Sequence, residues 1–423
     1  MRRTRVSGEV RVPGDKSISH RALIFAALAE GSSRLRGIAR SDDVESTARV
    51  LRALGAEIPP LSDDMVVSGH GLRSLRAPSE DLDCGNSGTT ARLMAGVVAG
   101  SGLRARFVGD QSLSRRPMRR IAEPLAAMGA TVELERGDGL PMTVSAGGGA
   151  LRAIEWSTET PSAQVKSAIL LAALVAGVPA LVREPARTRD HTERMLGAMG
   201  ARVEGAGTSS GLAPVERLQP LDLTIPRDPS TAAFFVALAT LADEGELALP
   251  ELCLNVTRTG FFSALRAMGA RLEVALSEAQ GGEPVGSVTA RPAALRGIEV
   301  APRDVPAMID ELPLLACVAA RARGETVVTG AGELRVKESD RIGAIVSNLR
   351  SLGVEVEELP HGMRVRGGGG PMRGAVRSWG DHRIAMAFGV LGALAGNEIT
   401  VDDRQCVGVS YPSFWDDLAR VLH

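Results

Sequence analysis

Short polar clusters recur along this 423-residue sequence, and each one precedes an apolar, alanine-rich run. The first, DKSISHR, brings Lys16, Ser17 and Arg21 close together. A lysine, hydroxyls and an arginine suit a phosphorylated ligand, because they supply positive charge and several hydrogen-bond donors. A helix N-cap followed by solvated charges would give the same pattern, so both interpretations stay open. The sequence contains no G-x-x-x-x-G-K-[ST] phosphate loop.

The next clusters carry amide, hydroxyl and guanidinium groups. GNSGTTAR opens with Asn86 and Gly88, and a glycine there lets a ligand approach the backbone closely. In DQSLSRRPMRR, Arg116 precedes a proline that suits a first helical turn, so we expect this arginine to point inward. PSAQVKS supplies Ser162 and Gln164. For each cluster the alternative is a plain helix cap or a solvated charged face.

Candidate acid–base groups lie in the second half of the sequence. Asp310 stands in PAMIDELPLLA, where a carboxylate beside an apolar run is either an N-cap or a group that can take up a proton. The other charged clusters are TRDHTERM in the first half, with Arg189, and two in the second half: RVKESDR, with Lys337, Glu338 and Arg341, and GDHR, with His382 and Arg383. Local ion pairs and a structural histidine are the alternatives. No HExxH or CxH metal motif occurs, so we expect no metal.

A repeat organises these clusters. The phrase L-x-x-[LM]-G ends at Gly55, Gly129, Gly200, Gly269 and Gly353, each time after an amphipathic run and before a β-type run. This pattern predicts a helix that is closed by a glycine and followed by a strand. The polar clusters recur at a similar spacing and predict a second helix in each repeat. A period of about 70 residues indicates six repeats.

The repeat predicts two domains of three repeats each. A sixth phrase near the C-terminus lacks its strand, and the segment Thr4–Val12 is predicted to supply it. Both termini then fall in one domain, so we expect residues 14–226 in one domain and residues 1–13 plus 227–423 in the other. If the six polar helix N-termini converge, they form a cleft suited to phosphate and carboxylate.

Composition excludes several classes of protein. The formal net charge is -1, from 49 basic and 50 acidic side chains, and aromatic residues make up 3%, which disfavours a nucleic-acid-binding protein. The longest apolar run is too short for a membrane span, and the basic N-terminus has no apolar stretch behind it. Four scattered cysteines suit a reducing compartment, so we expect a cytoplasmic protein that does not contact membranes.

Taken together and in order, the motifs PGDKSISHRA, GNSGTTARL, RRPM, PSAQVKSA, MIDELP, RVKESDR and GDHRIAM resemble the EPSP synthase family over essentially the whole chain. The resemblance implies an α/β fold, a two-domain inverted α/β barrel with three βαβαββ-type repeats in each domain. It also implies transfer of the enolpyruvyl group of phosphoenolpyruvate to the 5-hydroxyl of shikimate 3-phosphate, in a monomer without a cofactor. Gly88 is then expected to leave room for the inhibitor glyphosate.

The resemblance also implies roles for the candidate residues. For shikimate 3-phosphate it implies contacts from Lys16, Ser17, Arg21, Ser162, Ala163, Gln164, Arg189, Asp310 and Lys337. For phosphoenolpyruvate it implies Lys16, Asn86, Gly88, Arg116, Gln164, Arg341, His382 and Arg383. Asp310 is the expected base, Glu338 and Lys16 compete for the role of acid, and His382 lies by the reacting carbons.

Departures from the better-known subgroup indicate a second subgroup. Ala163 stands where a second serine is common, and Val409 stands where a lysine that contacts phosphoenolpyruvate is often found. The alternative function is that of the sister enzyme, which transfers the enolpyruvyl group to UDP-N-acetylglucosamine. That enzyme usually carries a reactive cysteine in a loop, and the matching segment here, DQSLSRRPM, has none.

Overall fold

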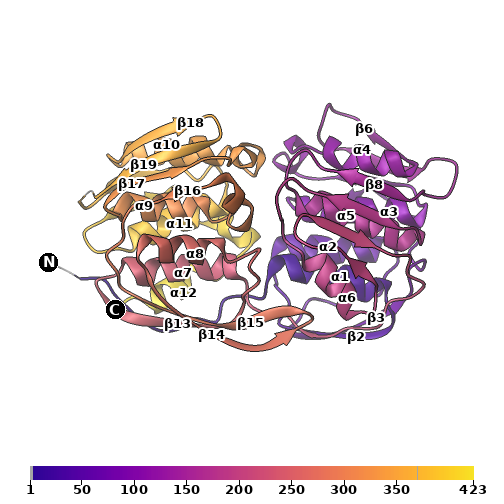
Figure 1. Ribbon diagram of the computed structural model, residues 1–423, viewed down its shortest axis with the longest axis horizontal. Helices are drawn as coiled ribbons and strands as arrows, with labels where there is room; N and C mark the ends of the chain where they lie inside the picture. Colours follow the sequence, from indigo (N-terminus) through magenta and orange to yellow (C-terminus); the bar gives the residue numbers. More distant parts are fainter. Residues whose placement is uncertain (1–2, 369) are drawn as a thin grey trace. The chain divides into compact units, whose positions relative to one another are not determined.

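The computed structural model describes residues 3–368 and 370–423, which form two compact units (Figure 1). The central unit consists of residues 14–225 together with the short segment 279–283. The terminal unit consists of the chain up to Pro13, residues 226–278 and residues 284–423, so it contains both chain ends. The connections follow Pro13 and Ile225, and the segment 279–283 is a brief excursion from the terminal unit.

The central unit contains three sheets, each with two helices. The first repeat comprises β12 (Asp222–Thr224), α1 (Lys16–Leu28), β2 (Glu30–Arg36), α2 (Asp42–Ala53) and β3 (Asp64–His70). The second comprises β4 (Leu82–Asp83), α3 (Gly88–Ser101), β5 (Ala105–Val108), α4 (Arg119–Met128), β6 (Ala130–Leu134) and β7 (Met142–Ala146). The third comprises β8 (Ile154–Ser157), α5 (Ala163–Ala176), β9 (Ala180–Arg183), α6 (His191–Ala198), β10 (Val203–Glu204) and β11 (Ser209–Leu212).

The terminal unit repeats the same plan. Its first repeat comprises β1 (Arg5–Glu9), α7 (Pro229–Leu241), β13 (Glu244–Cys253), α8 (Gly260–Met268), β14 (Arg271–Gln280) and β15 (Glu283–Arg291). The next comprises β16 (Glu299–Val300), α9 (Leu312–Arg321), β17 (Gly324–Val328), α10 (Arg341–Ser351), β18 (Glu355–Leu359) and β19 (Gly362–Gly367). The last comprises β20 (Arg373–Val376), α11 (His382–Gly392), β21 (Glu398–Val401) and α12 (Phe414–Arg420).

The two helices of a repeat differ in burial, and the sequence explains why. The first helices α1, α5 and α7 are apolar on almost every side and are buried along nearly their whole length. A helix that is hydrophobic all round lies inside a protein. The second helices α4 and α8 are amphipathic and bury one face only. Within the described residues, no helix combines the length and apolar character that a membrane span requires.

Strand pairing follows one rule in all six sheets. The first two strands of each repeat run parallel, as β8 and β9 do, because a helix joins them or because a distant segment supplies the first strand. Where a repeat closes with two strands, they form an antiparallel hairpin, as β6 and β7 do. This hairpin completes the expected βαβαββ pattern, whereas the first repeat closes with the single strand β3 and the last repeat has no strand after α12 within the described residues.

The predicted helix ends are largely confirmed. Ser87, Ser162 and Asp381 are N-caps whose side chains accept backbone N–H groups of α3, α5 and α11. Gly129 and Gly269 close α4 and α8 in the left-handed conformation, which glycine adopts without strain.

The N-terminal segment pairs differently from the prediction. β1 forms a parallel ladder with β13, from Arg5 opposite Glu244 to Glu9 opposite Ala248, so it supplies the first strand of the fourth repeat. With the sixth repeat, which was expected to receive it, the segment forms an isolated bridge between Val6 and Leu422 but no ladder among the described residues. Correspondingly, β12 comes after the third repeat in sequence and supplies the first strand of the first repeat. The prediction that the N-terminal segment completes a repeat was right, but it assigned this segment to the sixth repeat and not to the fourth.

Candidate functional site

The predicted residues gather in two groups, one in each unit. The central cluster contains Lys16, Ser17, Arg21, Asn86, Gly88, Arg116, Ser162, Ala163, Gln164 and Arg189, and the terminal cluster contains Asp310, Lys337, Glu338, Arg341, His382 and Arg383. In both clusters the residues lie at or near the starts of helices, or in the segments just before them. Helix N-termini present unpaired N–H groups and partial positive charge, so both clusters suit anions.

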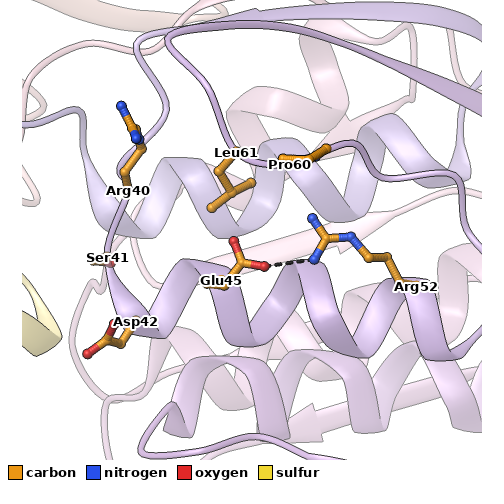
Figure 2. A pocket seen from close by; sticks show the side chains of 7 residues that line it. All are labelled: Arg40, Ser41, Asp42, Glu45, Arg52, Pro60 and Leu61. Carbon is orange, nitrogen blue, oxygen red and sulfur yellow. Dashed lines mark hydrogen bonds and ion pairs between the residues drawn. The ribbon is translucent and has the colours of Figure 1, made fainter.

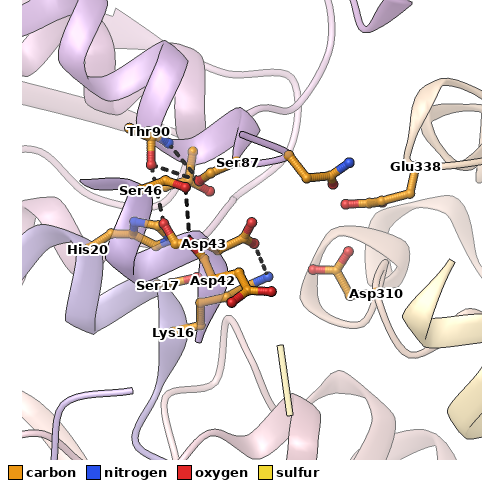
Figure 3. Close-up of polar contacts among 12 residues, drawn as sticks. Lys16, Ser17, His20, Asp42, Asp43, Ser46, Ser87, Thr90, Asp310 and Glu338 are labelled. Carbon is orange, nitrogen blue, oxygen red and sulfur yellow. Dashed lines mark hydrogen bonds and ion pairs between the residues drawn. The ribbon is translucent and has the colours of Figure 1, made fainter. Parts of the chain in front are cut away.

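Lys16 is the first residue of α1, and its ammonium pairs with a carboxylate of the next helix. Its Nζ lies 2.7 Å from Oδ2 of Asp43, and the two side chains are largely buried (Figure 3). Asp15 caps α1 by accepting the backbone N–H of Ile18. The cap is therefore supplied by the residue before the lysine, which leaves Lys16 to an ionic role.

Arg21 joins three helices beneath Ser17 and is itself buried. Its guanidinium donates to the backbone oxygen of Ser17 at 2.9 Å, to Oγ of Ser167 at 2.8 Å and to Oγ1 of Thr192 at 2.7 Å. Arg189 reaches the same place and donates to Oγ of Ser17 at 3.5 Å. The structure thus brings Ser17, Arg21 and Arg189 together, as the family resemblance implied.

Asn86 and Arg116 also meet. Nη2 of Arg116 donates to Oδ1 of Asn86 at 2.6 Å and to Oγ of Ser112 at 3.2 Å. Nδ2 of Asn86 donates in turn to Asp110 at 2.6 Å. Arg116 is buried, which agrees with the expectation that it points inward rather than onto a solvated face.

Gly88 and Gln164 are connected through an arginine that the sequence analysis did not single out. Nη1 of Arg92 donates to Oε1 of Gln164 at 2.7 Å, and Nη2 donates to the backbone oxygen of Pro117 at 3.0 Å. Nε2 of Gln164 donates to Thr89 at 2.9 Å. A Cβ at Gly88 would stand 2.8 Å from Nη1 of Arg92, so any larger residue there pushes this arginine aside.

Ser162 and Ala163 begin α5. Oγ of Ser162 accepts the backbone N–H of Val165 at 3.4 Å, so this serine does form the plain cap that was its alternative interpretation. Its own backbone N–H donates to Oε1 of Glu184 at 3.3 Å. Ala163 offers a ligand no polar side-chain atom.

A buried chain of hydrogen-bonded side chains links α1, α2 and the start of α3 near Lys16, and His20, Ser87 and Thr90 of this chain are labelled in Figure 3. Nδ1 of His20 lies 2.6 Å from Oγ1 of Thr47, which lies 2.7 Å from Oγ1 of Thr90, and this oxygen contacts Oγ of Ser87 at 2.8 Å. Nε2 of His20 is buried and has no hydrogen-bond partner among the described residues. Burial, helped by the charges of Lys16 and Arg21, holds the pKa of His20 well below its usual value.

The terminal cluster is organised around Arg341, the first residue of α10, which is 1% exposed. Its guanidinium contacts three carboxylates: Asp381 at 2.8 Å, Asp310 at 3.2 Å and Glu338 at 2.7 Å. Burial alone lowers the pKa of this guanidinium, but the three carboxylates outweigh burial and raise it. Lys337 approaches the same Oδ1 of Asp310 at 3.4 Å.

Asp310 is not the cap of α9. The N-cap position is Glu311, and Asp310 lies in the turn before it, so the N-cap interpretation of Asp310 was wrong. Asp310 and Glu338, both labelled in Figure 3, are held by the same arginine. Two carboxylates fixed beside an arginine and a lysine can exchange protons with a ligand while the cations hold its charge.

His382 and Arg383 open α11 behind the cap Asp381. His382 is buried, and Nη1 of Arg383 lies 3.5 Å from both Oε1 of Glu311 and the backbone oxygen of Ser230. Within the described residues, no group of three or more His, Cys, Asp or Glu side chains could hold a metal ion.

One pocket lies outside both clusters (Figure 2). It is lined by Arg40, Ser41, Asp42, Glu45, Arg52, Pro60 and Leu61. Arg52 is occupied there by Glu45 at 2.7 Å and by the backbone oxygens of Ile58 and Pro59. None of the predicted site residues lines this pocket, and we assign it no role.

Sequence reasoning missed Asp43, Arg92 and the ionic role of Asp381. Arg92 stands four residues after Gly88 on the same helix, so its helical spacing could have identified it. Asp43 stands in an acidic first turn, a position that also stabilises a helix without any function. Only the fold reveals that it faces Lys16.

Comparisons with known proteins agree over the whole chain. The family described as EPSP synthase (3-phosphoshikimate 1-carboxyvinyltransferase) matches residues 1–418. A 3-phosphoshikimate 1-carboxyvinyltransferase of Sulfurihydrogenibium sp. (strain YO3AOP1) is 46% identical over 421 residues, which cover 99% of this chain and 97% of that protein. A counterpart from Thermus thermophilus is 48% identical over 416 residues, covering 98% of this chain and 96% of that protein.

A solved structure supports the fold. The EPSP synthase from Acinetobacter baumannii superimposes with a TM-score of 0.87 at 38% identity, covering 100% of this chain and 97% of that one. This match confirms the predicted α/β class, the two-domain inverted α/β barrel with three βαβαββ-type repeats in each domain.

Proposed function

Because the chain belongs to the EPSP synthase family, we propose that it transfers the enolpyruvyl group of phosphoenolpyruvate to the 5-hydroxyl of shikimate 3-phosphate and releases phosphate. The structural observation that carries the proposal is the terminal cluster, where one buried arginine holds Asp310 and Glu338 beside Lys337. Such a group combines proton transfer with charge neutralisation, and this reaction needs both.

Shikimate 3-phosphate is assigned to residues whose donors surround the starts of α1 and α5. The phosphate suits Ser17, Arg21 and Arg189, which already converge. The proposed set is completed by Lys16, Ser162, Ala163, Gln164, Asp310 and Lys337. In this assignment Arg21 acts mainly by fixing the backbone of Ser17, because its guanidinium is engaged by three oxygens of the protein.

Phosphoenolpyruvate is assigned to a second set of cations. Arg116 is held by Asn86, and Gly88 keeps the space next to Arg92 and Arg116 open. The proposed set also includes Lys16, Gln164, Arg341, His382 and Arg383. Arginine is suited to this task because its planar fork can hold a phosphate or carboxylate through two bonds.

The chemistry proceeds by addition and elimination. Asp310 takes the proton of the 5-hydroxyl while the oxygen of that hydroxyl bonds to carbon 2 of phosphoenolpyruvate. Carbon 3 gains a proton from Glu338 or Lys16. The tetrahedral intermediate then loses a proton from carbon 3 and expels phosphate. His382 lies by the reacting carbons in this assignment. The cations stabilise the charges that develop, so we propose that the reaction needs no metal or organic cofactor.

We further propose that the protein acts as a cytoplasmic monomer and contacts neither nucleic acid nor membranes. The near-neutral charge supports this, since surfaces that bind nucleic acid are usually strongly basic. Transfer to UDP-N-acetylglucosamine is the alternative, and no cysteine lies in the segment 110–118 where the sister enzyme carries one.

The test is phosphate release from phosphoenolpyruvate with shikimate 3-phosphate and a chelator present. Release that depends on shikimate 3-phosphate is expected, with none when UDP-N-acetylglucosamine replaces it. Release with UDP-N-acetylglucosamine alone would transfer the protein to the alternative function. Silence with both acceptors would refute the proposal.

A further inference from the structure

Lysine is rare in this chain. The sequence contains three lysines and 46 arginines. Two of the lysines, Lys16 and Lys337, already belong to the proposed site. The third, Lys166, has no part in the assignment above.

Lys166 lies in α5, one turn after Ser162, and is 2% exposed. Its Nζ is 2.8 Å from Oε2 of Glu184 and 2.9 Å from Oε1 of Glu193. Burial lowers the pKa of the ammonium, but the two carboxylates outweigh this and raise it. Lys166 is therefore a buried cation between two carboxylates, and removing it would leave both without their positive partner.

The Glu184 arm leads to residues of the central cluster. Glu184 follows β9, and its Oε1 accepts the backbone N–H of Ser162. Oγ1 of Thr188 lies 2.7 Å from Oε1 and 2.9 Å from Oε2 of the same carboxylate. Thr188 directly precedes Arg189 in the sequence, and the guanidinium of Arg189 donates to Oγ of Ser17. Fixing Glu184 thus fixes the segment 184–189 against the start of α5.

Glu193, the second partner of Lys166, contacts a residue outside the central cluster. Glu193 lies in the first turn of α6 and also accepts Oγ of Ser210 in β11 at 2.8 Å. Its Oε2 is buried without a hydrogen-bond partner among the described residues. A glutamine here keeps the oxygen that accepts from Lys166 and Ser210, so the Glu193 arm can lose its charge without losing its contacts.

We infer that Lys166 is a positioning residue for shikimate 3-phosphate: by holding Glu184 it places Arg189 and the start of α5 around the phosphate. The inference rests on the proposed function. It assigns Lys166 no contact with substrate or with the reacting atoms.

The experiment titrates shikimate 3-phosphate into the full chain by calorimetry and measures KM for both substrates. Lys166→Met and Glu184→Gln are expected to raise the dissociation constant for shikimate 3-phosphate about tenfold to a hundredfold, the worth of one hydrogen bond to a charged group. KM for phosphoenolpyruvate is expected to change less than about threefold, since its proposed arginine ligands lie on other elements.

Two controls separate positioning from general stability. Glu193→Gln is expected to bind shikimate 3-phosphate as the wild type does. Glu155→Gln, in an exposed pair with Arg183 beside the same segment, is the matched surface control. If Lys166→Met does not fold, Thr188→Val carries the test, because it leaves all three charges in place and removes only the hydroxyl that ties Glu184 to the segment.

Wild-type binding by both Glu184→Gln and Thr188→Val would overturn the inference, as would equal losses in Glu184→Gln and Glu193→Gln. If the wild type itself does not bind shikimate 3-phosphate, the proposed function fails. Hydrogen–deuterium exchange then still tests the positioning: faster exchange in residues 184–189 of Glu184→Gln than of the wild type supports it, and equal exchange refutes it.

Discussion

Arg341 shows how one buried side chain can organise a reactive group. Its guanidinium spans Asp310, Glu338 and Asp381, so a single cation holds three carboxylates close together. The carboxylates need the cation, because like charges at this separation repel one another. The arginine needs the carboxylates, because a buried charge without a partner is costly.

Replacing this arginine should therefore destabilise the terminal unit. We expect Arg341→Met to lower its free energy of unfolding by about 3–5 kcal/mol, the cost of leaving buried charges without their partner. The measurement is urea unfolding followed by fluorescence of Trp379 and Trp415, which both lie in this unit. Arg364→Met removes a half-exposed arginine paired with Glu325 and should cost less than about 1 kcal/mol. Equal losses in both variants would contradict the central role of Arg341.

Asp310→Ala tests the proposed base. Removing the carboxylate is expected to lower kcat about a hundredfold or more, in the usual range for a general base. Asp304→Ala, an exposed aspartate of the same unit, is the control and should keep full turnover. Steady-state phosphate release measures both variants, and thermal melting confirms that they fold. Near-normal turnover in Asp310→Ala would remove the assignment.

His20 makes stability depend on acidity in a definite direction. The pKa of His20 in the folded chain lies well below 6.5, its value in the unfolded chain. Between these two values His20 is protonated in the unfolded chain but not in the folded chain. Below pH 6.5, His20 should therefore lower the free energy of unfolding by about 1.4 kcal/mol for each pH unit. Above pH 6.5 it should not change that free energy.

The measurement is the melting temperature from pH 7 to pH 5. His20→Gln should show a shallower decrease than the wild type, whereas the exposed His70→Gln should reproduce the wild-type decrease. Parallel curves for the wild type and His20→Gln would contradict a lowered pKa of His20 in the folded chain.

Residue identities were more predictable from the sequence than their contacts. The first motif located Ser17 and Arg21, the family resemblance added Arg189, and the structure brings these residues together. The spacing of Arg92 from Gly88 places both on one face of α3, but spacing alone does not give the partner of this arginine. Its contact with Gln164 depends on how α3 packs against α5, and a linear pattern does not encode that.

At the scale of elements, the approach of α3 to α5 sets the spacing of the central cluster. Gly96 and Gly100 of α3 face α5 so closely that a Cβ at these positions would stand 2.2 Å from the backbone oxygen of Ala168 and 2.6 Å from that of Ala172. Small residues let two helix backbones come together, and here they bring Thr89 within reach of Gln164.

Gly96→Ala should force these helices apart. We expect the central unit to lose about 1–3 kcal/mol, the usual cost of overpacking. The matched control is Gly197→Ala in α6, where an added Cβ meets nothing within 4 Å, so that variant should be neutral or up to about 1 kcal/mol more stable. Fluorescence of Trp156 during urea unfolding reports on this unit. A loss confined to Gly197→Ala would contradict the role of Gly96.

The elements themselves were largely predictable. The L-x-x-[LM]-G phrase located α4 and α8 with their closing glycines, because a left-handed C-cap strongly favours glycine. The partner of β1 was not predictable in the same way. Strand pairing depends on contacts between residues more than 200 positions apart, and β1 has the same local sequence character whichever repeat receives it.

At the scale of the molecule, each unit depends on a strand that is distant in sequence. β1 supplies the first strand for β13, and β12 supplies the first strand for β2. Val6, Val10 and Val12 are each 1% exposed or less, so the segment also contributes to the core of the terminal unit.

Deleting residues 1–9 should therefore weaken a sheet that lies more than 200 residues further along the chain. We expect faster hydrogen–deuterium exchange in β13 and β15, because β13 loses its parallel ladder and its backbone groups face solvent. Exchange in β2 and β3 of the central unit serves as the internal control and should not change. Unchanged exchange in β13 would show that the N-terminal strand is dispensable.

Because β1 and β12 each pair with a strand distant in sequence, the fold does not require the natural order of segments along the chain. The backbone N–H of His423 donates to the backbone oxygen of Arg5 at 3.0 Å, so the two ends of the chain lie side by side in the terminal unit. A circular permutant that joins these ends and opens between Ile225 and Pro226 would encode the terminal unit as one uninterrupted stretch, apart from residues 279–283, and then the central unit. The same sheets would form, but one covalent connection would join the two halves where the natural order uses two.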